Sequence, residues 1–279
     1  MESPFPPFDP EGDENAQSEI DSSKIRLRDI PLRTIFPNLL TLLAICSGLT
    51  AIRFAVEGRI ELSVAAIIFA GFLDGIDGRV ARFLKSSSRF GAEMDSLADF
   101  VNFGVAPAML LYFIFLSDVA SVGWIAALIY ASCACLRLAR FNVMLDNPNT
   151  PNWQYRFFIG VPAPASALIV LLPVYIHLLG IEPTPLFAWA TLGFTLICGF
   201  LMVSNLPTFS GKNISEKIRT DLVMPLMIVV VALAAAIFSY PWWVLSTLAV
   251  LYLISLPFSF RNWNRYNRQT QAAASSEEE

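Results

Sequence analysis

The chain has 279 residues, of which 55% are hydrophobic and 15% charged, with a formal net charge of −4 at pH 7. Its mean hydropathy of +0.57 is too high for an ordinary soluble domain. These values predict an integral membrane protein. No nucleic acid is expected among its partners.

The two ends of the chain differ from its middle. Residues 1–23 are rich in Pro, Glu, Asp and Ser without periodicity, which predicts a disordered cytosolic tail and no signal peptide. Residues 24–32 are basic and amphipathic and are expected to lie at the membrane surface. Residues 33–260 are expected to form one transmembrane domain, and residues 261–279 a second cytosolic tail.

Eight apolar segments have the length of about 20 residues that crosses a bilayer as a helix. The predicted fold class is therefore all-α integral membrane, with about eight transmembrane helices. The segments run over about 33–54, 60–83, 94–116, 120–142, 159–180, 184–206, 220–239 and 241–259.

The basic residues of the loops predict the orientation of these helices. With eight spans, all of the 19 Lys and Arg residues except Arg53 and Arg59 fall on one side. Positive loops face the cytoplasm. We therefore expect a multi-pass protein of the inner (cytoplasmic) membrane with both termini in the cytoplasm.

Four carboxylates lie inside two of these apolar segments, at Asp74, Asp77, Asp95 and Asp99. A charged side chain at membrane depth costs roughly 2.5–3.5 kcal/mol, so each acid needs a partner or a function. Acids cannot neutralise one another, whereas hard divalent cations prefer oxygen ligands. The stretch predicts a metal site on the cytoplasmic side.

Helical spacing places these acids on two faces that can oppose each other. Asp95 and Asp99 are four residues apart, so they share one face of the second helix. The corresponding face of the first helix carries Asp74, Asp77, Gly78 and Ala81, with Arg82 beside them. The alternative is a solvated hairpin with scattered acids, which the apolar flanks disfavour.

The acids belong to a longer pattern, D-x-x-D-G-x-x-A-R, eight residues, then G-x-x-x-D-x-x-x-D. It is met by Asp74, Asp77, Gly78, Ala81, Arg82, Gly91, Asp95 and Asp99. This pattern resembles the signature of the CDP-alcohol phosphatidyltransferases, which are membrane enzymes of phospholipid synthesis. The resemblance implies a core of six helices, here followed by two C-terminal helices, and a homodimer.

Three further blocks resemble those of the bacterial phosphatidylserine synthases in this family. They are 100–108 (FVNFGVAPA), 136–142 (LRLARFN) and 160–165 (GVPAPA). One departure is Asn102, which follows Val101 where those synthases typically have a serine. The resemblance therefore bears more closely on the core chemistry than on the second substrate.

The resemblance implies transfer of the phosphatidyl group from CDP-diacylglycerol to L-serine, giving phosphatidylserine and CMP. Two divalent cations, Mg²⁺ or Mn²⁺, would bridge the diphosphate of the donor. Asp74, Asp77 and Asp95 would be the principal metal ligands. Asp99 would also bind metal and would take the proton of the attacking hydroxyl.

The substrate-binding residues follow from the same resemblance. Those expected to bind CDP-diacylglycerol are Pro37, Asn38, Thr41, Asp74, Gly78, Ala81, Arg82, Arg89 and Gly91. Asn38 and Thr41 have helix capping as an alternative role. Asn102, Arg137 and Arg140 are the candidates for binding serine, because a serine carboxylate needs a cationic partner. The alternative is that both arginines only mark the cytoplasmic end of a membrane span and bind no substrate.

Two other functions remain open from the residues alone. One is a sister enzyme that uses choline, inositol or glycerol phosphate as the acceptor. The other is a cation transporter, which the position of the acids at one cytoplasmic hairpin disfavours.

Overall fold

The computed structural model describes residues 32–84, 88–145, 157–204, 207–209 and 220–257. The two expected tails and the expected surface segment up to residue 31 lie outside the described residues. So does the polar turn at 85–87 between the two acid-bearing helices.

The described chain is almost entirely helical. Its α-helices are α2 (Leu32–Val56), α3 (Ile60–Phe83), α4 (Arg89–Asp99), α5 (Ala106–Ile114), α6 (Ala120–Leu145), α7 (Ala163–Val170), α8 (Leu172–Leu178), α9 (Pro185–Val203) and α10 (Thr220–Ser239), followed by the helix Pro241–Pro257. A π-helix, η2 (Phe100–Val105), joins α4 to α5, and a 3₁₀ helix, η3 (Leu116–Val119), precedes α6.

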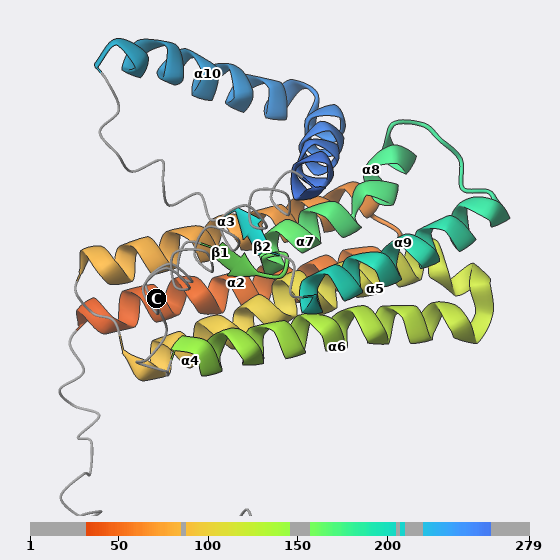
Figure 1. Cartoon of the computed structure of the whole chain (residues 1–279), viewed down its shortest axis with the longest axis horizontal. Helices are drawn as coiled ribbons and strands as arrows, with labels where there is room; N and C mark the ends of the chain where they lie inside the picture. Colours follow the sequence, from red (N-terminus) through yellow and green to blue (C-terminus); the bar gives the residue numbers. More distant parts are fainter. Residues whose placement is uncertain (1–31, 85–87, 146–156, 205–206, 210–219, 258–279) are drawn as a thin grey trace, which may run out of the picture.

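The long helices α2, α3, α6 and α9 run side by side and form a bundle with α4 and α5, whereas α10 lies to one side (Figure 1). The antiparallel hairpin of α2 and α3 turns at Glu57–Arg59, where Gly58 adopts a positive φ of 73°. A left-handed residue is the usual way to end a helix sharply, and glycine adopts it without strain.

Four helical stretches are long and apolar enough to cross a membrane: Ile35–Val56, Arg89–Ile114, Leu116–Met144 and Pro185–Val203. Shorter apolar helices cover Ala163–Leu178, Met227–Ser239 and Pro241–Pro257. A predominantly helical membrane protein is thus confirmed. The number of eight spans stays a prediction.

Two predicted spans are not single α-helices. The span predicted at 94–116 begins at Arg89 and passes through the π-helix η2 before it continues as α5. The span predicted at 159–180 is divided into α7 and α8. The break precedes Pro173, which has no N–H to donate to the carbonyl of Ile169 four residues earlier.

A short antiparallel ribbon was not expected from the sequence. Strand β1 (Phe157–Ile159) pairs with β2 (Pro207–Phe209), with Phe157 opposite Phe209. The predicted start of the fifth span at residue 159 and the predicted end of the sixth at residue 206 are therefore wrong, because the first is in a strand and α9 ends at Val203.

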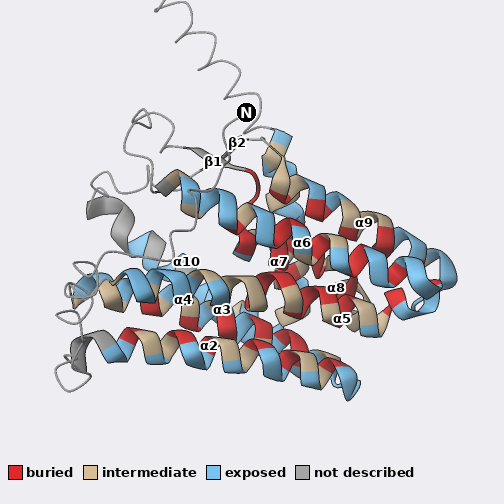
Figure 2. Cartoon of the chain, turned by 90° about the horizontal axis from the view of Figure 1, so that it is seen from below, coloured by how far each residue is buried: buried red, intermediate tan, exposed pale blue. Residues whose placement is uncertain are grey.

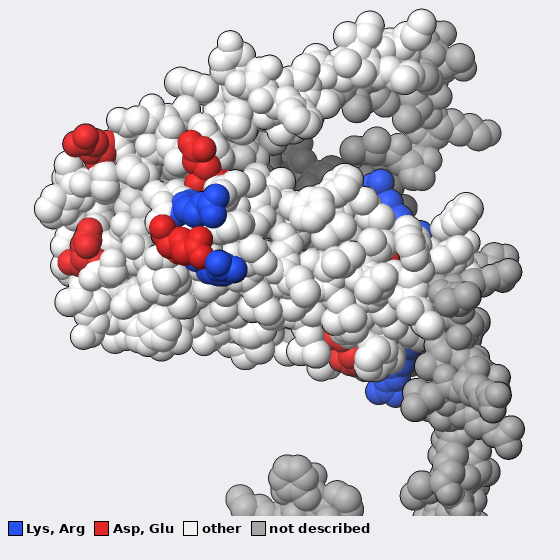
Figure 3. All heavy atoms as spheres, turned by 180° about the vertical axis from the view of Figure 1, so that it is seen from behind, with Lys and Arg blue, Asp and Glu red and all other residues white. Residues whose placement is uncertain are grey.

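Burial follows the places where the bundle helices meet (Figure 2). The largest fully buried side chains include Tyr130, Tyr175 and Phe115. The surface of α10 instead exposes apolar side chains such as Met227 and Phe238, as expected of a helix that faces lipid. On the face shown in Figure 3, charged atoms form separate groups with uncharged surface between them.

Candidate active site

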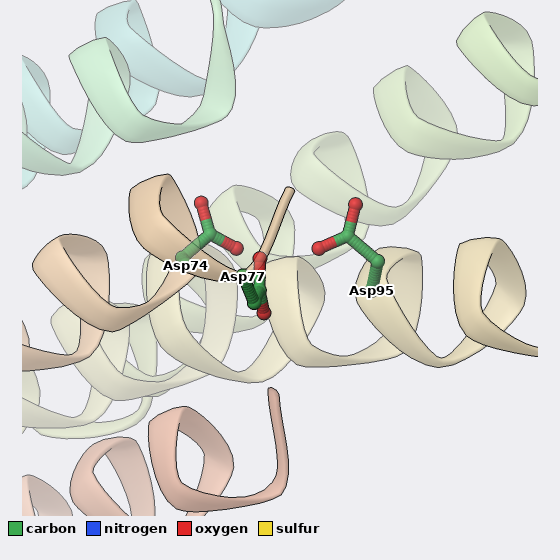
Figure 4. A group of neighbouring side chains, drawn as sticks. All are labelled: Asp74, Asp77 and Asp95. Atoms are coloured by element: carbon green, nitrogen blue, oxygen red, sulfur yellow. The ribbon is translucent and has the colours of Figure 1, made fainter. Parts of the chain in front are cut away.

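Three of the four acids form a compact group at the facing sides of α3 and α4 (Figure 4). Asp74, Asp77 and Asp95 each offer an oxygen, and these oxygens lie within 4.8 Å of one another. Oxygen ligands lie about 2.0–2.6 Å from Mg²⁺ or Ca²⁺, so two ligands of one ion are at most about 5 Å apart. The spacing therefore fits a shared divalent cation.

Asp77 is held in this group by a residue of the neighbouring helix. It is 3% exposed, and its Oδ2 accepts a hydrogen bond of 2.6 Å from Thr41 Oγ1 on α2. Its Oδ1 is buried and has no partner among the described residues. Thr41 thus fixes the carboxylate and leaves one oxygen for a ligand.

Asp99 lies at the end of α4 and is not one of these three acids. Its carboxyl group interacts with that of Asp74. The Oδ1 atoms of both residues are buried and unpartnered within the described chain. Two carboxylates this close repel each other when both are ionised, so a cation at this site relieves a conflict that the fold itself creates.

Arg137 of α6 brings a positive charge to the same place. It interacts electrostatically with Asp99 and also with Tyr252 of the helix Pro241–Pro257. Its Nε is buried and finds no hydrogen-bond acceptor among the described residues. The guanidinium therefore keeps a donor for a further anionic group near Asp99.

A pocket of about 200 Å³ opens beside the acids. Its walls come from α2, α3 and the first turns of α4. It is lined by Pro37, Asn38, Thr41, Asp77, Gly78, Ala81, Arg82, Ser88, Gly91, Ala92 and Asp95. The structure thus brings together all of the residues expected to bind the nucleotide lipid except Asp74 and Arg89, which do not line this pocket.

The first turn of α4 supplies two lining residues that were not predicted, Ser88 and Ala92. Ser88 is the N-cap of α4, and its hydroxyl accepts from Gly91 N at 3.0 Å. A Cβ at Gly91 would lie 3.1 Å from Asn38 Oδ1. Glycine at this position therefore lets the start of α4 approach α2 closely enough to form the pocket wall.

The other two residues predicted to bind serine lie in different surroundings. Asn102 is fully buried in η2, and both of its amide atoms lack a partner among the described residues. It packs against α2, where a Cβ on Gly48 would overlap its Oδ1. Arg140 is exposed, and its Nη1 donates a 2.9 Å hydrogen bond to Val203 O at the end of α9.

The site belongs to a region that matches known proteins. The model of the CDP-alcohol phosphatidyltransferase family matches residues 34–201. A second model, CDP-alcohol phosphatidyltransferase 2, matches residues 221–257. The first match covers more than half of the chain and includes all four acids. The chain belongs to the CDP-alcohol phosphatidyltransferase family.

Three of the curated relatives that this chain matches carry the name CDP-diacylglycerol–serine O-phosphatidyltransferase. The protein of that name from Mycobacterium leprae is 40% identical over 246 residues, which cover 86% of this chain and 79% of the relative. The Mycobacterium tuberculosis protein is 40% identical over 233 residues, covering 82% and 79%. The Helicobacter pylori protein is 35% identical over 224 residues, covering 79% and 88%.

Two features of this phosphatidyltransferase site were missed from the sequence. The bond between Thr41 and Asp77 joins residues 36 positions apart, and the electrostatic interaction of Arg137 with Tyr252 involves the last described helix. Neither has a local signal in the sequence, because each contact depends on how separate helices pack. The N-cap Ser88 could have been found, since a serine before an apolar helix is a standard capping signal.

Proposed function

We propose that this phosphatidyltransferase moves the phosphatidyl group of CDP-diacylglycerol to L-serine, giving phosphatidylserine and CMP. The observation that carries the proposal is the convergence of Asp74, Asp77 and Asp95 beside a pocket. The name shared by the relatives, which are 35–40% identical over most of the chain, supports the same reaction.

The donor half of the site consists of α2, α3 and the start of α4. Here the pocket at Asn38 and Gly91 takes the cytidine end of the donor, and Arg82 and Arg89 neutralise its phosphates. Small residues at Gly78 and Ala81 leave room for the diphosphate beside the acids. This assignment explains why the pocket wall contains so few bulky side chains.

The acids suit two divalent cations, Mg²⁺ or Mn²⁺. Asp74, Asp77 and Asp95 would hold them, with Asp99 as a further ligand, and the buried unpartnered oxygens of Asp74, Asp77 and Asp99 are the atoms available for this role. Bound cations of this kind withdraw charge from the phosphoryl group under attack and from the departing CMP.

The acceptor half is formed by Asp99, Asn102 and Arg137. The serine hydroxyl oxygen attacks the phosphorus that carries the diacylglycerol, and a new P–O bond forms. The P–O bond to CMP breaks, and CMP leaves with that electron pair. Asp99 takes the proton of the serine hydroxyl, because a hydroxyl is a weak nucleophile until a positioned base removes its proton.

Arg137 is the residue that we propose for the carboxylate of serine. Its buried Nε has an unused donor, and its charge acts on Asp99. A guanidinium can bind a carboxylate through two hydrogen bonds, which orients the amino acid as well as attracting it. Asn102 and Arg140 are further candidates for binding serine.

We also propose a membrane location, an orientation and an oligomeric state for the protein. The protein lies in the cytoplasmic membrane with its termini and active site facing the cytoplasm, as the distribution of Lys and Arg indicates. It acts as a homodimer, in line with the family resemblance. Residues 33–260 form the catalytic membrane domain, and residues 1–23 and 261–279 are tails.

The test is an acceptor panel with purified protein, CDP-diacylglycerol and Mn²⁺. Release of CMP should rise with L-serine and much less with choline, inositol or glycerol 3-phosphate, and the lipid product should carry the serine headgroup. Equal or greater stimulation by another alcohol would contradict serine as the acceptor. Release of CMP without any acceptor would indicate a hydrolase.

A further inference from the structure

The helix that carries Asp95 and Asp99 changes its hydrogen-bonding pattern directly after Asp99. Segment η2 is a π-helix, in which Ala106 N donates to Val101 O five residues earlier. Such wide turns are uncommon and occur often at functional sites. The side chains after Asp99 therefore point in directions that a continuous α-helix would not give them.

Pro107 leaves one carbonyl of this segment without its α-helical donor. Proline has no N–H, so residue 107 can donate neither to the carbonyl of Phe103, its partner in an α-helix, nor to that of Asn102, its partner in a π-helix. A buried carbonyl without a partner costs roughly as much as a lost hydrogen bond. Phe103 is 3% exposed, so water is a poor substitute.

Tyr130 of α6 supplies the missing donor. Its hydroxyl donates to Phe103 O at 3.2 Å, and the residue is fully buried. The same hydroxyl lies 3.3 Å from Ser166 Oγ on α7. Since the proton of Tyr130 is used by the carbonyl, Ser166 donates to Tyr130. Three segments, η2, α6 and α7, are joined through one oxygen atom.

The same face of α6 also reaches the acceptor half of the site. Tyr130, Ala134 and Arg137 are separated by four and three residues, so they lie on one side of the helix. A Cβ on Gly104 would lie 2.9 Å from that of Ala134, so α6 packs directly on η2 here. Arg137 interacts with Asp99 one turn further along.

We propose that Tyr130 is a positioning residue for phosphatidyl transfer: its hydroxyl replaces the N–H that Pro107 lacks and fixes the wide turn that follows Asp99 against α6, the helix that carries Arg137. This inference rests on the proposed function only in assigning Asp99 and Arg137 to the acceptor step. Tyr130 itself touches neither substrate.

The test is Tyr130→Phe, which removes one oxygen and keeps the ring. We expect the maximal rate to fall about 3- to 10-fold, as for loss of one buried hydrogen bond at a site that must stay aligned. The KM for CDP-diacylglycerol and the Mn²⁺ concentration for half-maximal activity should stay within about twofold, because the donor half is formed by other helices. Tyr175→Phe is the matched control, since Tyr175 of α8 is equally buried.

A double-mutant cycle with Pro107→Ala tests the reason for the effect. Alanine restores an N–H at residue 107, so Tyr130→Phe should lower the rate less in the Pro107→Ala background than in the wild type. If Tyr130→Phe prevents folding, Ser166→Ala takes its place in the same cycle, because it weakens the same hydroxyl network from α7.

Failure of this inference is separable from failure of the proposed function. All rates are measured with whichever alcohol the wild-type protein accepts, so a wild type inactive with serine overturns only the proposed acceptor. Three results would each overturn the positioning role. The first is equal maximal rates for the Tyr130→Phe and Tyr175→Phe variants, and the second is a Tyr130→Phe defect confined to the KM for CDP-diacylglycerol. The third is strict additivity of the Tyr130→Phe and Pro107→Ala effects.

Discussion

The two halves of the candidate site are organised differently. The donor half lies on the α2–α3 hairpin and the first turns of α4, where the polar side chains line an open pocket. The acceptor half lies between α4, η2 and α6, where Arg137 Nε and both amide atoms of Asn102 are buried without partners among the described residues. The first half is open for a large substrate. The acceptor half contains buried polar groups whose unpartnered atoms are available to a small substrate.

This difference indicates how the two substrates are recognised. A nucleotide lipid needs space and close approach of backbones, which Gly78, Ala81 and Gly91 provide. A small zwitterion needs a few fixed charges, and buried charges are strong because little water screens them. Substitutions in the two halves should therefore alter different kinetic parameters.

The largest effect is expected where the halves meet, at the acids. Asp95→Asn should reduce turnover by at least about 10²- to 10³-fold, since metal assistance contributes several kcal/mol to such reactions. Chelation should abolish the activity of the wild type, and Mg²⁺ or Mn²⁺ should restore it. The control is Glu93→Gln, an exposed acid on the same helix. Turnover in excess chelator would contradict a metal site.

Asp99→Asn should affect the maximal rate more than binding of the donor. Loss of a general base typically costs about 10²- to 10⁴-fold. Asp118→Asn, at an exposed acid of η3, is the control. If the maximal rate is unchanged and CDP-diacylglycerol binds more weakly, Asp99 acts in binding the donor and not in the attack by the acceptor.

Arg137→Ala should raise the KM for serine about 10- to 100-fold, because a charge-assisted hydrogen bond contributes roughly 1.5–3 kcal/mol. The KM for CDP-diacylglycerol should barely change. Arg140→Ala is the comparison, and a smaller rise is expected because Arg140 donates to Val203 O. Equal effects of Arg137→Ala on both substrates would show that the halves are not separate.

The smallest effect is expected from Thr41→Val, which removes the bond to Asp77. Residues that orient a metal ligand affect metal affinity by about 10- to 100-fold, and we expect the lower limit because Asp77 itself remains. The measurement is the Mn²⁺ concentration for half-maximal activity. Thr50→Val is a close control, since Thr50 is an exposed threonine of the same helix whose hydroxyl donates to Cys46 O. Equal results for the two variants would remove Thr41 from the site.

The same division explains how much could be predicted from the sequence. The eight motif positions run along two neighbouring helices, so helical spacing alone predicted that Asp74, Asp77 and Asp95 would converge. Most of the pocket could also be predicted, because its residues lie on the same hairpin or on the helix before it.

The acceptor half was harder to predict because it depends on packing. Proline near the start of a helix is common, so Pro107 alone did not predict the π-helix before α5. The contact of Tyr130 with Phe103 joins residues 27 positions apart, and no periodicity predicts it. Likewise, Asn102 was predicted to bind serine, and its burial against Gly48 of α2 had no signal in the sequence.

The central claim is that the serine hydroxyl oxygen attacks the phosphatidyl phosphorus, and isotope transfer tests it most directly. Purified protein would be given CDP-diacylglycerol, Mn²⁺ and L-serine labelled with ¹⁸O in its hydroxyl group, and both products would be analysed by mass spectrometry. We predict that the label is retained in phosphatidylserine and absent from CMP. Phosphatidylserine without the label, or no serine-containing lipid at all, would contradict the account.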